Sequence, residues 1–288
     1  MESRLLFIIN SISGGISKQH LTQEILEVFS DFTYQLRWTE YAGHASQIAR
    51  EEFFKTDLVI IIGGDGTICE ILPELLNHPK ILLTILPYGS GNAIARYFNF
   101  SKNLKELRHR IIKNKLKKID LGRCNRQYFL GFTGLGLDAE IAKSFQNSKK
   151  RGFLGYISHT LQVFWTFKPI AITLNINNKI QKFNNILLCT FANVQQFGNH
   201  FYIAPQASAE DGFFTVAVLR KFPLYLLPQF LYLIFTKKIQ DFRYYQSFLA
   251  QKIELDGNNF NLNLDGEFVK KEEKLEIEIL PQAISVLI

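Results

Sequence analysis

A run of apolar residues, "VIII" at 59–62, is followed at once by two glycines, a carboxylate, a third glycine and a threonine. Gly63, Gly64 and Gly66 can adopt positive φ, so successive backbone N–H groups could point into one concavity that suits a phosphate oxygen. Thr67 would lie at the N-terminus of the next helix, where its hydroxyl and the helix dipole favour an anion. The pattern predicts a phosphate-binding turn, and the alternative is a tight strand-to-helix turn without a ligand.

Asp65 is the unexpected member of this turn. A carboxylate inside an anion-binding turn is repulsive unless it binds a cation or accepts a hydrogen bond from a donor. Its presence indicates either Mg²⁺ or a hydroxyl group, which would belong to a ribose or to the acceptor of a transferred group.

Two further turns of similar composition are "NSISGG" at 10–15 and "PYGSGNAIAR" at 87–96. Ser13, Ser90 and Asn92 offer hydroxyl and amide donors. Arg96 could neutralise phosphate charge, although a single arginine is more often a surface cation. The pattern GxxxxGK[ST] does not occur, which excludes a Walker-type loop.

The elements of the first third alternate between strands and helices. Near-continuous apolar runs predict strands at 4–10, 33–40, 57–62 and 81–87, and apolar residues at helical spacing predict helices at 21–29, 45–53 and 67–78. Such strands are typical of a parallel sheet covered on both faces. Ligands bind at the carboxyl ends of such strands, so all three glycine turns could line a single site.

After about Asp120 the sequence becomes rich in short strands separated by Asn, Gly or Lys turns. They are predicted at 127–134, 170–177, 185–194, 213–219, 251–257, 260–267 and 274–280. One helical segment follows Asp138 and continues through 152–167.

A second helical segment, 222–238, is apolar on every face, too short to span a bilayer, and interrupted by Pro228. It is either a core helix or a helix that dips into a membrane surface, with Lys237 and Lys238 at the headgroups.

Composition and charge limit the possible partners. The chain has 288 residues, 47% of them hydrophobic and 20% charged, which fits two globular domains. The first residues lack the pattern of a signal peptide, so we expect a cytoplasmic protein. Cys69, Cys124 and Cys189 are odd in number and far apart, which fits neither a disulfide framework nor a zinc site. We expect reduced, mostly buried thiols.

The net charge of +7 is concentrated in one region. Residues 141–209 contain no Asp or Glu, and their seven cations are Lys143, Lys149, Lys150, Arg151, Lys168, Lys179 and Lys182. The region is either a solvated face or a surface attracted to anions, which would be lipid headgroups or nucleic acid. Because no nucleic-acid-binding motif accompanies it, we expect an anionic membrane surface and no nucleic acid as partner.

The motifs together resemble a known family. "NSISGG", "GGDGT" followed by Glu70, "LPYGSGNAIAR", "IDLG", "GLGLDAEIA", "FANVQQFGNHFYIAPQASAEDGFFTV" and "LDGE" occur in the order seen in the diacylglycerol kinase catalytic-domain family, which includes sphingosine and ceramide kinases. The resemblance covers Leu5 to Leu287. GGDG alone is shared with NAD kinases and phosphofructokinases, whereas the late blocks are specific to the lipid-kinase branch.

The resemblance implies a Rossmann-like nucleotide domain with a parallel sheet, residues 1–122 with 282–288 returning to it, and a C-terminal β-sandwich lipid-binding domain, residues 123–281. It also implies ATP and Mg²⁺, with Asp65 and Glu267 near the phosphoryl-transfer centre and either of them accepting the proton of the lipid hydroxyl. The residues expected to bind ATP are Asn10, Ser13, Gly14, Gly15, Thr39, Gly63, Gly64, Gly66, Thr67, Gly89, Ser90, Gly91, Asn92 and Arg96. Asp138 matches a position where sphingosine kinases hold the polar head of the lipid.

Departures from the family leave the substrate and the metal ligands open. Bacterial diacylglycerol kinases usually have an Asn-Asp pair where this chain has Asn92 and Ala93, and the missing Asp contributes to metal binding in that family. "GSGNAIA" instead resembles the sphingosine kinases. Ser11 stands where Pro is favoured, and Cys69 stands where Asn is common, with no role that we can assign.

The sequence therefore predicts an ATP-dependent lipid kinase of phospholipid metabolism. It would phosphorylate a primary hydroxyl of diacylglycerol or a sphingoid-type lipid, as a peripheral protein at the inner membrane face. The alternatives are an NAD kinase-like enzyme with a soluble substrate and a non-catalytic membrane-binding regulator of the same fold. Acyl-chain preference and oligomeric state are left open.

Overall fold

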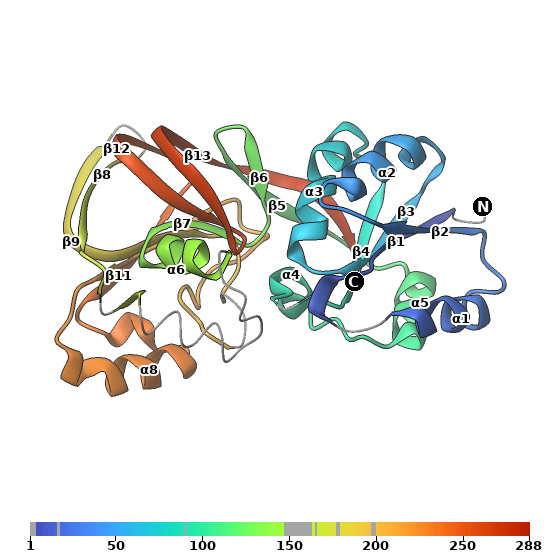
Figure 1. Cartoon of the computed structure of the whole chain (residues 1–288), viewed down its shortest axis with the longest axis horizontal. Coiled ribbons are helices and arrows are strands. Elements are labelled where there is room, and N and C mark those ends of the chain that lie inside the picture. The colour runs from blue at the N-terminus through green and yellow to red at the C-terminus, as the bar shows by residue number, and fades with distance from the viewer. Residues whose placement is uncertain are drawn as a thin grey trace. The chain divides into compact units, whose positions relative to one another are not determined.

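The chain divides into two compact units in the computed structural model, which describes residues 4–15, 18–89, 91–146, 163–164, 166–176, 179–196 and 200–288. Unit 1 comprises Met1–Asp120 and Gln282–Ile288, and unit 2 comprises Leu121–Pro281 (Figure 1). Most of the helix predicted at 152–167 lies outside the described residues.

Unit 1 is built on a parallel sheet. Its strands are β1 (Leu5–Asn10), β2 (Tyr34–Thr39), β3 (Leu58–Gly63) and β4 (Leu82–Pro87), in the order β2-β1-β3-β4. All neighbouring strands are parallel, and the end of β13 (Glu267–Leu287) adds a further parallel strand beside β4. Every residue of β3 is buried, which fits a strand covered on both faces.

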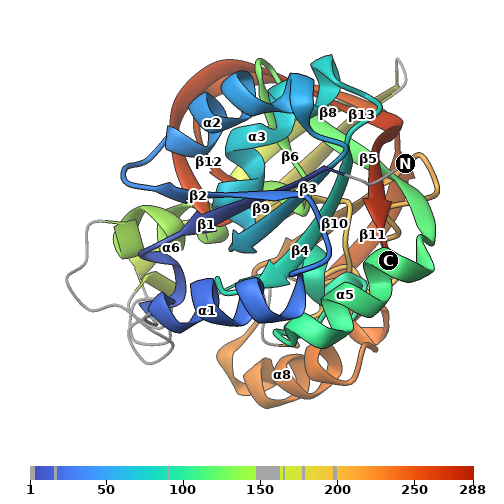
Figure 2. The ribbon, with the colours of Figure 1, turned by 90° about the vertical axis from the view of Figure 1, so that its right-hand side faces the viewer.

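Helices cover both faces of this sheet. Helices α1 (Gln19–Val28) and α5 (Leu104–Lys113) pack on one face, and α2 (His44–Glu52) and α3 (Asp65–Asn77) on the other (Figure 2). The short helix α4 (Ala93–Tyr97) follows β4. Single 3-10 turns form at Ser13–Gly15 and Phe53–Lys55.

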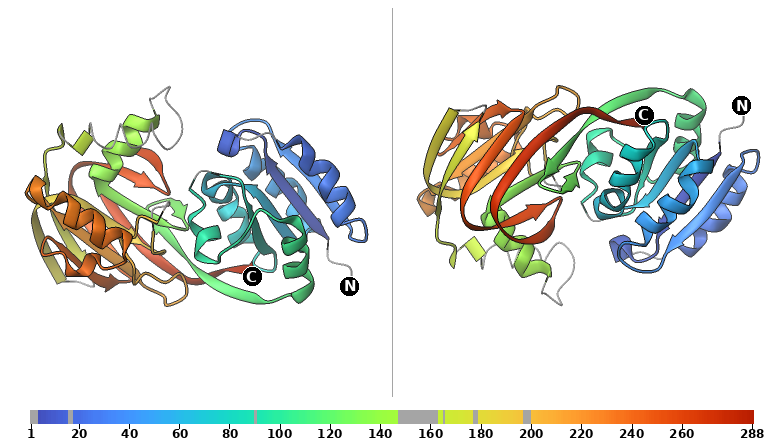
Figure 3. Two further views of the ribbon diagram at one scale, coloured as in Figure 1. Left: turned by 90° about the horizontal axis from the view of Figure 1, so that it is seen from below. Right: turned by 90° about the horizontal axis from the view of Figure 1, so that it is seen from above.

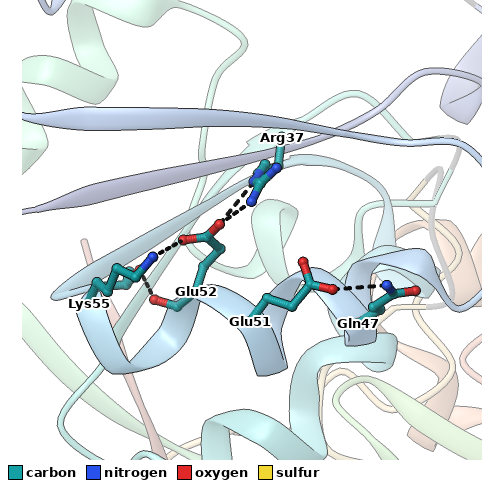
Figure 4. Close-up of polar contacts among 6 residues, drawn as sticks. Arg37, Gln47, Glu51, Glu52 and Lys55 are labelled. Atoms are coloured by element: carbon teal, nitrogen blue, oxygen red, sulfur yellow. Dashed lines mark hydrogen bonds and ion pairs between the residues drawn. The ribbon is translucent and has the colours of Figure 1, made fainter.

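A buried carboxylate ties α2 to the sheet. Glu52 is only 3% exposed and pairs with Arg37 of β2 and with Lys55, whose ammonium is 3.6 Å from the Glu52 carboxylate (Figure 4). The Arg37 guanidinium donates two hydrogen bonds to one Glu52 oxygen, and this pairing raises the pKa of Arg37. The end of α2 is therefore fixed by charge as well as by apolar packing.

Unit 2 consists mainly of antiparallel strands. They are β5 (Leu116–Cys124, which begins in unit 1), β6 (Gln127–Phe129), β7 (Phe132–Gly136), β8 (Ile170–Ile176), β9 (Lys179–Ala192), β10 (Phe214–Arg220), β11 (Tyr245–Ala250), β12 (Lys252–Leu264) and most of β13. Its helices are α6 (Leu137–Gln146) and α8 (Leu227–Phe235), with 3-10 turns at Leu224–Leu226 and Ile239–Asp241.

Two long strands close this β structure on itself. Strand β9 pairs with β8 near its start and with β7 and β10 near its end, and β12 likewise pairs first with β8 and then with β7. The interior is filled by apolar side chains that include Leu174, Phe191 and Leu262. The predicted fold class, an α/β unit followed by a β-sandwich, is confirmed.

The structure joins elements that the sequence pattern separated. The strands expected at 251–257 and 260–267 are one strand, β12, because the hydrogen-bond ladder shifts register between Asp256 and Phe260 instead of ending. The strand expected at 274–280 continues to Leu287 as β13, which passes from unit 2 into unit 1 (Figure 3).

Within the segment predicted at 222–238, the α-helix runs only from Leu227 to Phe235, and the 3-10 turn Leu224–Leu226 precedes it. Pro228 lies in the first turn of α8, where its missing N–H costs no hydrogen bond. Among the described helices, none is long and apolar enough to cross a bilayer.

Candidate functional site

The three glycine turns follow the carboxyl ends of β1, β3 and β4, which are adjacent in the sheet order. The chain leaves β1 toward α1 on one face of the sheet and leaves β3 toward α3 on the other. Ligands of such sheets usually bind where the connections diverge in this way.

The turns pack so tightly that side chains are excluded. A Cβ atom added to Gly89 would lie 2.3 Å from the Cα of Gly64. Gly14 has a φ of +69°, and a Cβ there would lie 2.2 Å from the carbonyl oxygen of Tyr88. Glycine is therefore required at these positions by backbone contact between turns. The positive φ expected at Gly63, Gly64 and Gly66 is not observed, and Gly64 has a φ of −114°.

Hydrogen bonds lock the first turn to the second. The Asn10 amide donates to Thr67 Oγ1 over 2.9 Å, while Asn10 Oδ1 accepts from the backbone N–H groups of Ile12 and Ser13. Thr67 is 4% exposed, so this hydrogen bond between the two turns is buried on the Thr67 side. Ser11 donates to the carbonyl oxygen of Thr39, which connects the end of β2 to the same region.

Asp65 connects the second turn to the third. Its Oδ2 accepts a 3.0 Å hydrogen bond from the backbone N–H of Ala93, the first residue of α4. A Cβ on Gly91 would come within 2.9 Å of the same oxygen. The carboxylate of Asp65, the first residue of α3, is thus held by a backbone N–H at the N-terminus of α4.

The remaining predicted residues of this set mostly shape the third turn. Asn92 adopts a φ of 57°, accepts from Gly89 N–H and donates to the Gly89 carbonyl, so its amide braces the loop. Arg96 donates to the carbonyl of Gly91. Gly15, Gly63 and Gly66 lie in the first two turns, whereas Ser90 lies outside the described residues.

A buried cation beside the first turn was not predicted from the sequence. Lys18 is 2% exposed and donates to the carbonyl of Ser13 over 2.6 Å. Its ammonium lies 5.8 Å from the centre of the Tyr88 ring, and Lys102 lies 5.1 Å from the same ring. Burial and the charge of Lys102 lower the pKa of Lys18. The only signal in the sequence was a lysine three residues after a glycine pair.

In unit 2, Glu267 is the first residue of β13 and is exposed. The preceding hairpin turn is fixed by Asp265, whose carboxylate accepts backbone hydrogen bonds from Leu130, Gly131 and Phe132 at 2.7–2.8 Å. No role was predicted for Asp265 from the sequence, and in the structure it positions the turn before Glu267.

Asp138 is buried in unit 2, near the start of α6. The residue is 6% exposed, Oδ1 accepts from Ala139 N–H, and no hydrogen-bond partner among the described residues reaches Oδ2. Desolvation raises the pKa of this carboxyl to about 7. A buried oxygen of this kind is suited to bind a polar group of a ligand. Helix α6 lies beside the β12–β13 hairpin, since Glu140 pairs with Asn261.

The side chains that could act as metal ligands can be compared with what the predicted Mg²⁺ requires. In the described part of the chain, no three His, Cys, Asp or Glu side chains cluster as metal ligands. Mg²⁺ commonly binds one or two carboxylates together with substrate phosphates and water, so the Asp65 carboxylate, which lies where the second and third turns meet, fits such a shared site.

Comparison with known proteins gives two family matches that together span the chain. Residues 4–124 match the diacylglycerol kinase catalytic domain, and residues 131–288 match the YegS C-terminal NAD kinase beta sandwich-like domain.

Individual relatives agree with these matches. The chain is 29% identical over 228 residues to "Diacylglycerol kinase" of Bacillus subtilis strain 168, covering 76% of this chain and 74% of that protein. It is 26% identical over 294 residues to "Putative lipid kinase" of Staphylococcus aureus strain Mu3, covering 97% and 93%. The fold matches a crystal structure of "a putative diacylglycerol kinase from Bacillus anthracis str. Sterne", with a TM-score of 0.80, 22% identity and coverage of 99% and 96%.

Proposed function

Because the chain belongs to the diacylglycerol kinase catalytic-domain family and is a lipid kinase, a phosphotransferase, we propose that it transfers the γ-phosphate of ATP to a primary hydroxyl of a lipid at a membrane surface. The acceptor is diacylglycerol or a related sphingoid-type lipid. The name of the Bacillus subtilis relative makes diacylglycerol the first candidate.

The interlocked glycine turns of unit 1 are the observation that supports this proposal most strongly. Gly14, Gly64 and Gly89 let three backbone segments approach one another at the carboxyl edge of a parallel sheet. Backbone N–H groups and the N-terminus of the 13-residue helix α3 supply positive potential there, as a triphosphate requires. The buried Lys18 adds a full positive charge beside the first turn.

Phosphoryl transfer needs positioning, charge neutralisation and a base for one proton. The lipid hydroxyl oxygen bonds to the γ-phosphorus, ADP leaves, and a carboxylate receives the hydroxyl proton. Asp65 and Glu267 are the candidate bases. Asp65 would also hold Mg²⁺ together with phosphate oxygens, and the ion would supply charge neutralisation.

Asp138 is the proposed contact for the polar head of the lipid. Its carboxyl can accept from a hydroxyl or an ammonium group when it is ionised, and can donate when it is protonated. Both a diacylglycerol and a sphingoid base offer a suitable partner, so this residue does not distinguish them.

A transfer assay tests the proposal. Phosphate from γ-labelled ATP would be followed into diacylglycerol, monoacylglycerol, sphinganine and ceramide in mixed micelles, with NAD as a soluble control. We expect label in one lipid class and none in NAD. Label in NAD alone would overturn the lipid acceptor, and the NAD kinase-like description of the C-terminal domain makes this control necessary.

A further inference from the structure

Helix α8 and the turn before it present an apolar side to solvent. The exposed large side chains of this segment recur at the spacing of one helical stripe, and the exposed residues Pro228 and Gln229 lie between them in the sequence. We call them the α8 face: Leu224, Tyr225, Leu231, Tyr232 and Phe235. Tyr225 is 79% exposed and Phe235 is 51% exposed.

The opposite side of α8 packs against the core of unit 2. Phe230, Leu233 and Ile234 are buried in a cluster with Phe222 and Phe242. The Phe222 and Phe242 rings meet edge to face with centroids 5.1 Å apart. The helix is therefore anchored on one side, and the exposed apolar side is a separate feature.

Charge surrounds the α8 face without entering it. No charged residue occurs from Phe222 to Thr236, while cations stand immediately on both sides, at Arg220, Lys221, Lys237 and Lys238. Lys221, Lys237 and Lys238 are exposed, and the Lys237 ammonium lies 4.4 Å from the centre of the Tyr202 ring. From 212 to 253 the only acidic residue is Asp241.

We propose that the α8 face docks on an anionic phospholipid bilayer. Leu and Phe side chains would enter the acyl boundary, the two tyrosines would lie at the headgroup level, and the flanking lysines would reach lipid phosphates. The inference rests on the proposed function, because a kinase acting on a membrane lipid needs a surface that meets the bilayer. It identifies that surface.

Docking there puts the bilayer on the same side of the sheet as the proposed lipid contact, with α8 between the bilayer and the sheet. Alternation along β9 puts Leu188, Thr190 and Ala192 on one face of the sheet, and Leu188 and Ala192 belong to the cluster that α8 covers. Thr190 pairs with Gly134, and a Cβ on Gly134 would lie 2.2 Å from Asp138 Oδ2. Asp138 and the α8 cluster therefore lie on the same sheet face.

A vesicle co-sedimentation experiment tests the proposal. It compares the full chain with the double variant Leu231→Ser/Phe235→Ser on vesicles of phosphatidylcholine with and without phosphatidylglycerol. The matched control is Leu26→Ser/Phe54→Ser, which removes exposed apolar side chains from unit 1. We expect salt-sensitive binding to the anionic vesicles, a roughly tenfold or greater loss in the α8 variant, and no loss in the control.

Unchanged vesicle binding by a folded α8 variant overturns the proposal. The proposal is also overturned if light scattering shows that the wild type is a dimer and the α8 variant a monomer while both bind vesicles equally. The α8 face would then be a dimer contact. If the variant does not fold, Tyr232→Trp with lipids brominated in the acyl chain gives the answer: quenching supports docking and its absence overturns it. Vesicle binding that depends on the α8 face while no lipid is phosphorylated would refute the proposed function and leave the docking inference standing.

Discussion

Gly89 is a position where one added methyl group tests the phosphate site. A Cβ there would meet the Gly64 backbone and the side-chain oxygen Oδ1 of Asn92, so Gly89→Ala must push two turns apart. We expect a loss of about 1–3 kcal/mol in the free energy of unfolding and at least a roughly tenfold weaker nucleotide affinity. Thermal denaturation and calorimetric titration with an ATP analogue measure the two effects.

Gly43→Ala is the matched control. Gly43 has a φ of +89° but no atom within 4 Å of an added Cβ, so alanine costs backbone strain alone, about 1 kcal/mol. Nucleotide affinity should stay at the wild-type value. Equal affinities in Gly89→Ala and the wild type would remove the glycine turns from the nucleotide site.

The raised pKa of Asp138 leads us to expect that the stability difference between the wild type and Asp138→Asn depends on pH. Its folded pKa of about 7 lies above the usual value of 3.8, so between about pH 4 and 7 the folded protein binds more protons at this residue than the unfolded chain does. The wild type therefore loses stability as pH rises through this window, by an amount on the order of 4 kcal/mol at most. Asp138→Asn cannot ionise and should lack this loss.

Chemical denaturation at a series of pH values checks this prediction. The stability of Asp138→Asn relative to the wild type should rise between about pH 4 and 7 and stay constant above that range. Other titrating groups are shared by both proteins and cancel in the difference. A difference independent of pH would show that the carboxyl ionises as readily in the folded protein as in the unfolded chain.

At the scale of elements, the β12–β13 hairpin separates a structural carboxylate from a candidate catalytic one. Asp265→Ala leaves three backbone N–H groups without their acceptor, so the free energy of unfolding should fall by about 3 kcal/mol or more. Glu267→Gln changes an exposed side chain and should alter stability by less than about 0.5 kcal/mol.

The activity of Glu267→Gln should not follow its stability. Glu267→Gln is expected to reduce kcat by roughly 100-fold or more, because the amide cannot accept a proton. Denaturant titration and the transfer assay report the two quantities separately. A fully active Glu267→Gln would leave Asp65 as the only candidate base of the two.

The same hairpin shows how far the sequence can be interpreted. Period-two patterns located most of the strands after Asp120, and the family resemblance implied the sandwich. The union of two predicted strands into β12 was missed, because a register shift leaves no signature in the apolar pattern. The anchoring of Asp265 to residues 130–132 was missed because its partners are more than 130 positions away.

The turns of unit 1 were more predictable. A glycine turn at a strand end is a local feature, and parallel strands bring their carboxyl ends together, so the meeting of three turns followed from the pattern. Their interlocking contacts and the buried Lys18 depend on tertiary packing, which the sequence pattern does not contain.

For the whole molecule, we propose that unit 1 binds the nucleotide and unit 2 binds the lipid. Hydrogen exchange should show that a non-hydrolysable ATP analogue with Mg²⁺ protects 10–15, 63–67 and 88–93 in unit 1. A soluble short-chain lipid analogue should instead protect 133–139 in unit 2, since a bound ligand reduces local opening. Protection of the unit 2 segment by nucleotide alone would contradict this assignment.

Asp65 of unit 1 is proposed to be essential for phosphate transfer from ATP to a lipid, and one comparison of variants tests this role most directly. Transfer of label from γ-labelled ATP to diacylglycerol in mixed micelles would be measured for the wild type, Asp65→Asn and the surface control Asp31→Asn. Asp65→Asn keeps an oxygen for the Ala93 N–H, so the fold should persist while transfer falls by about 100-fold or more. Asp31→Asn, which loses only an exposed pair with Arg108, should remain active. Full activity in Asp65→Asn would contradict the assigned role of Asp65.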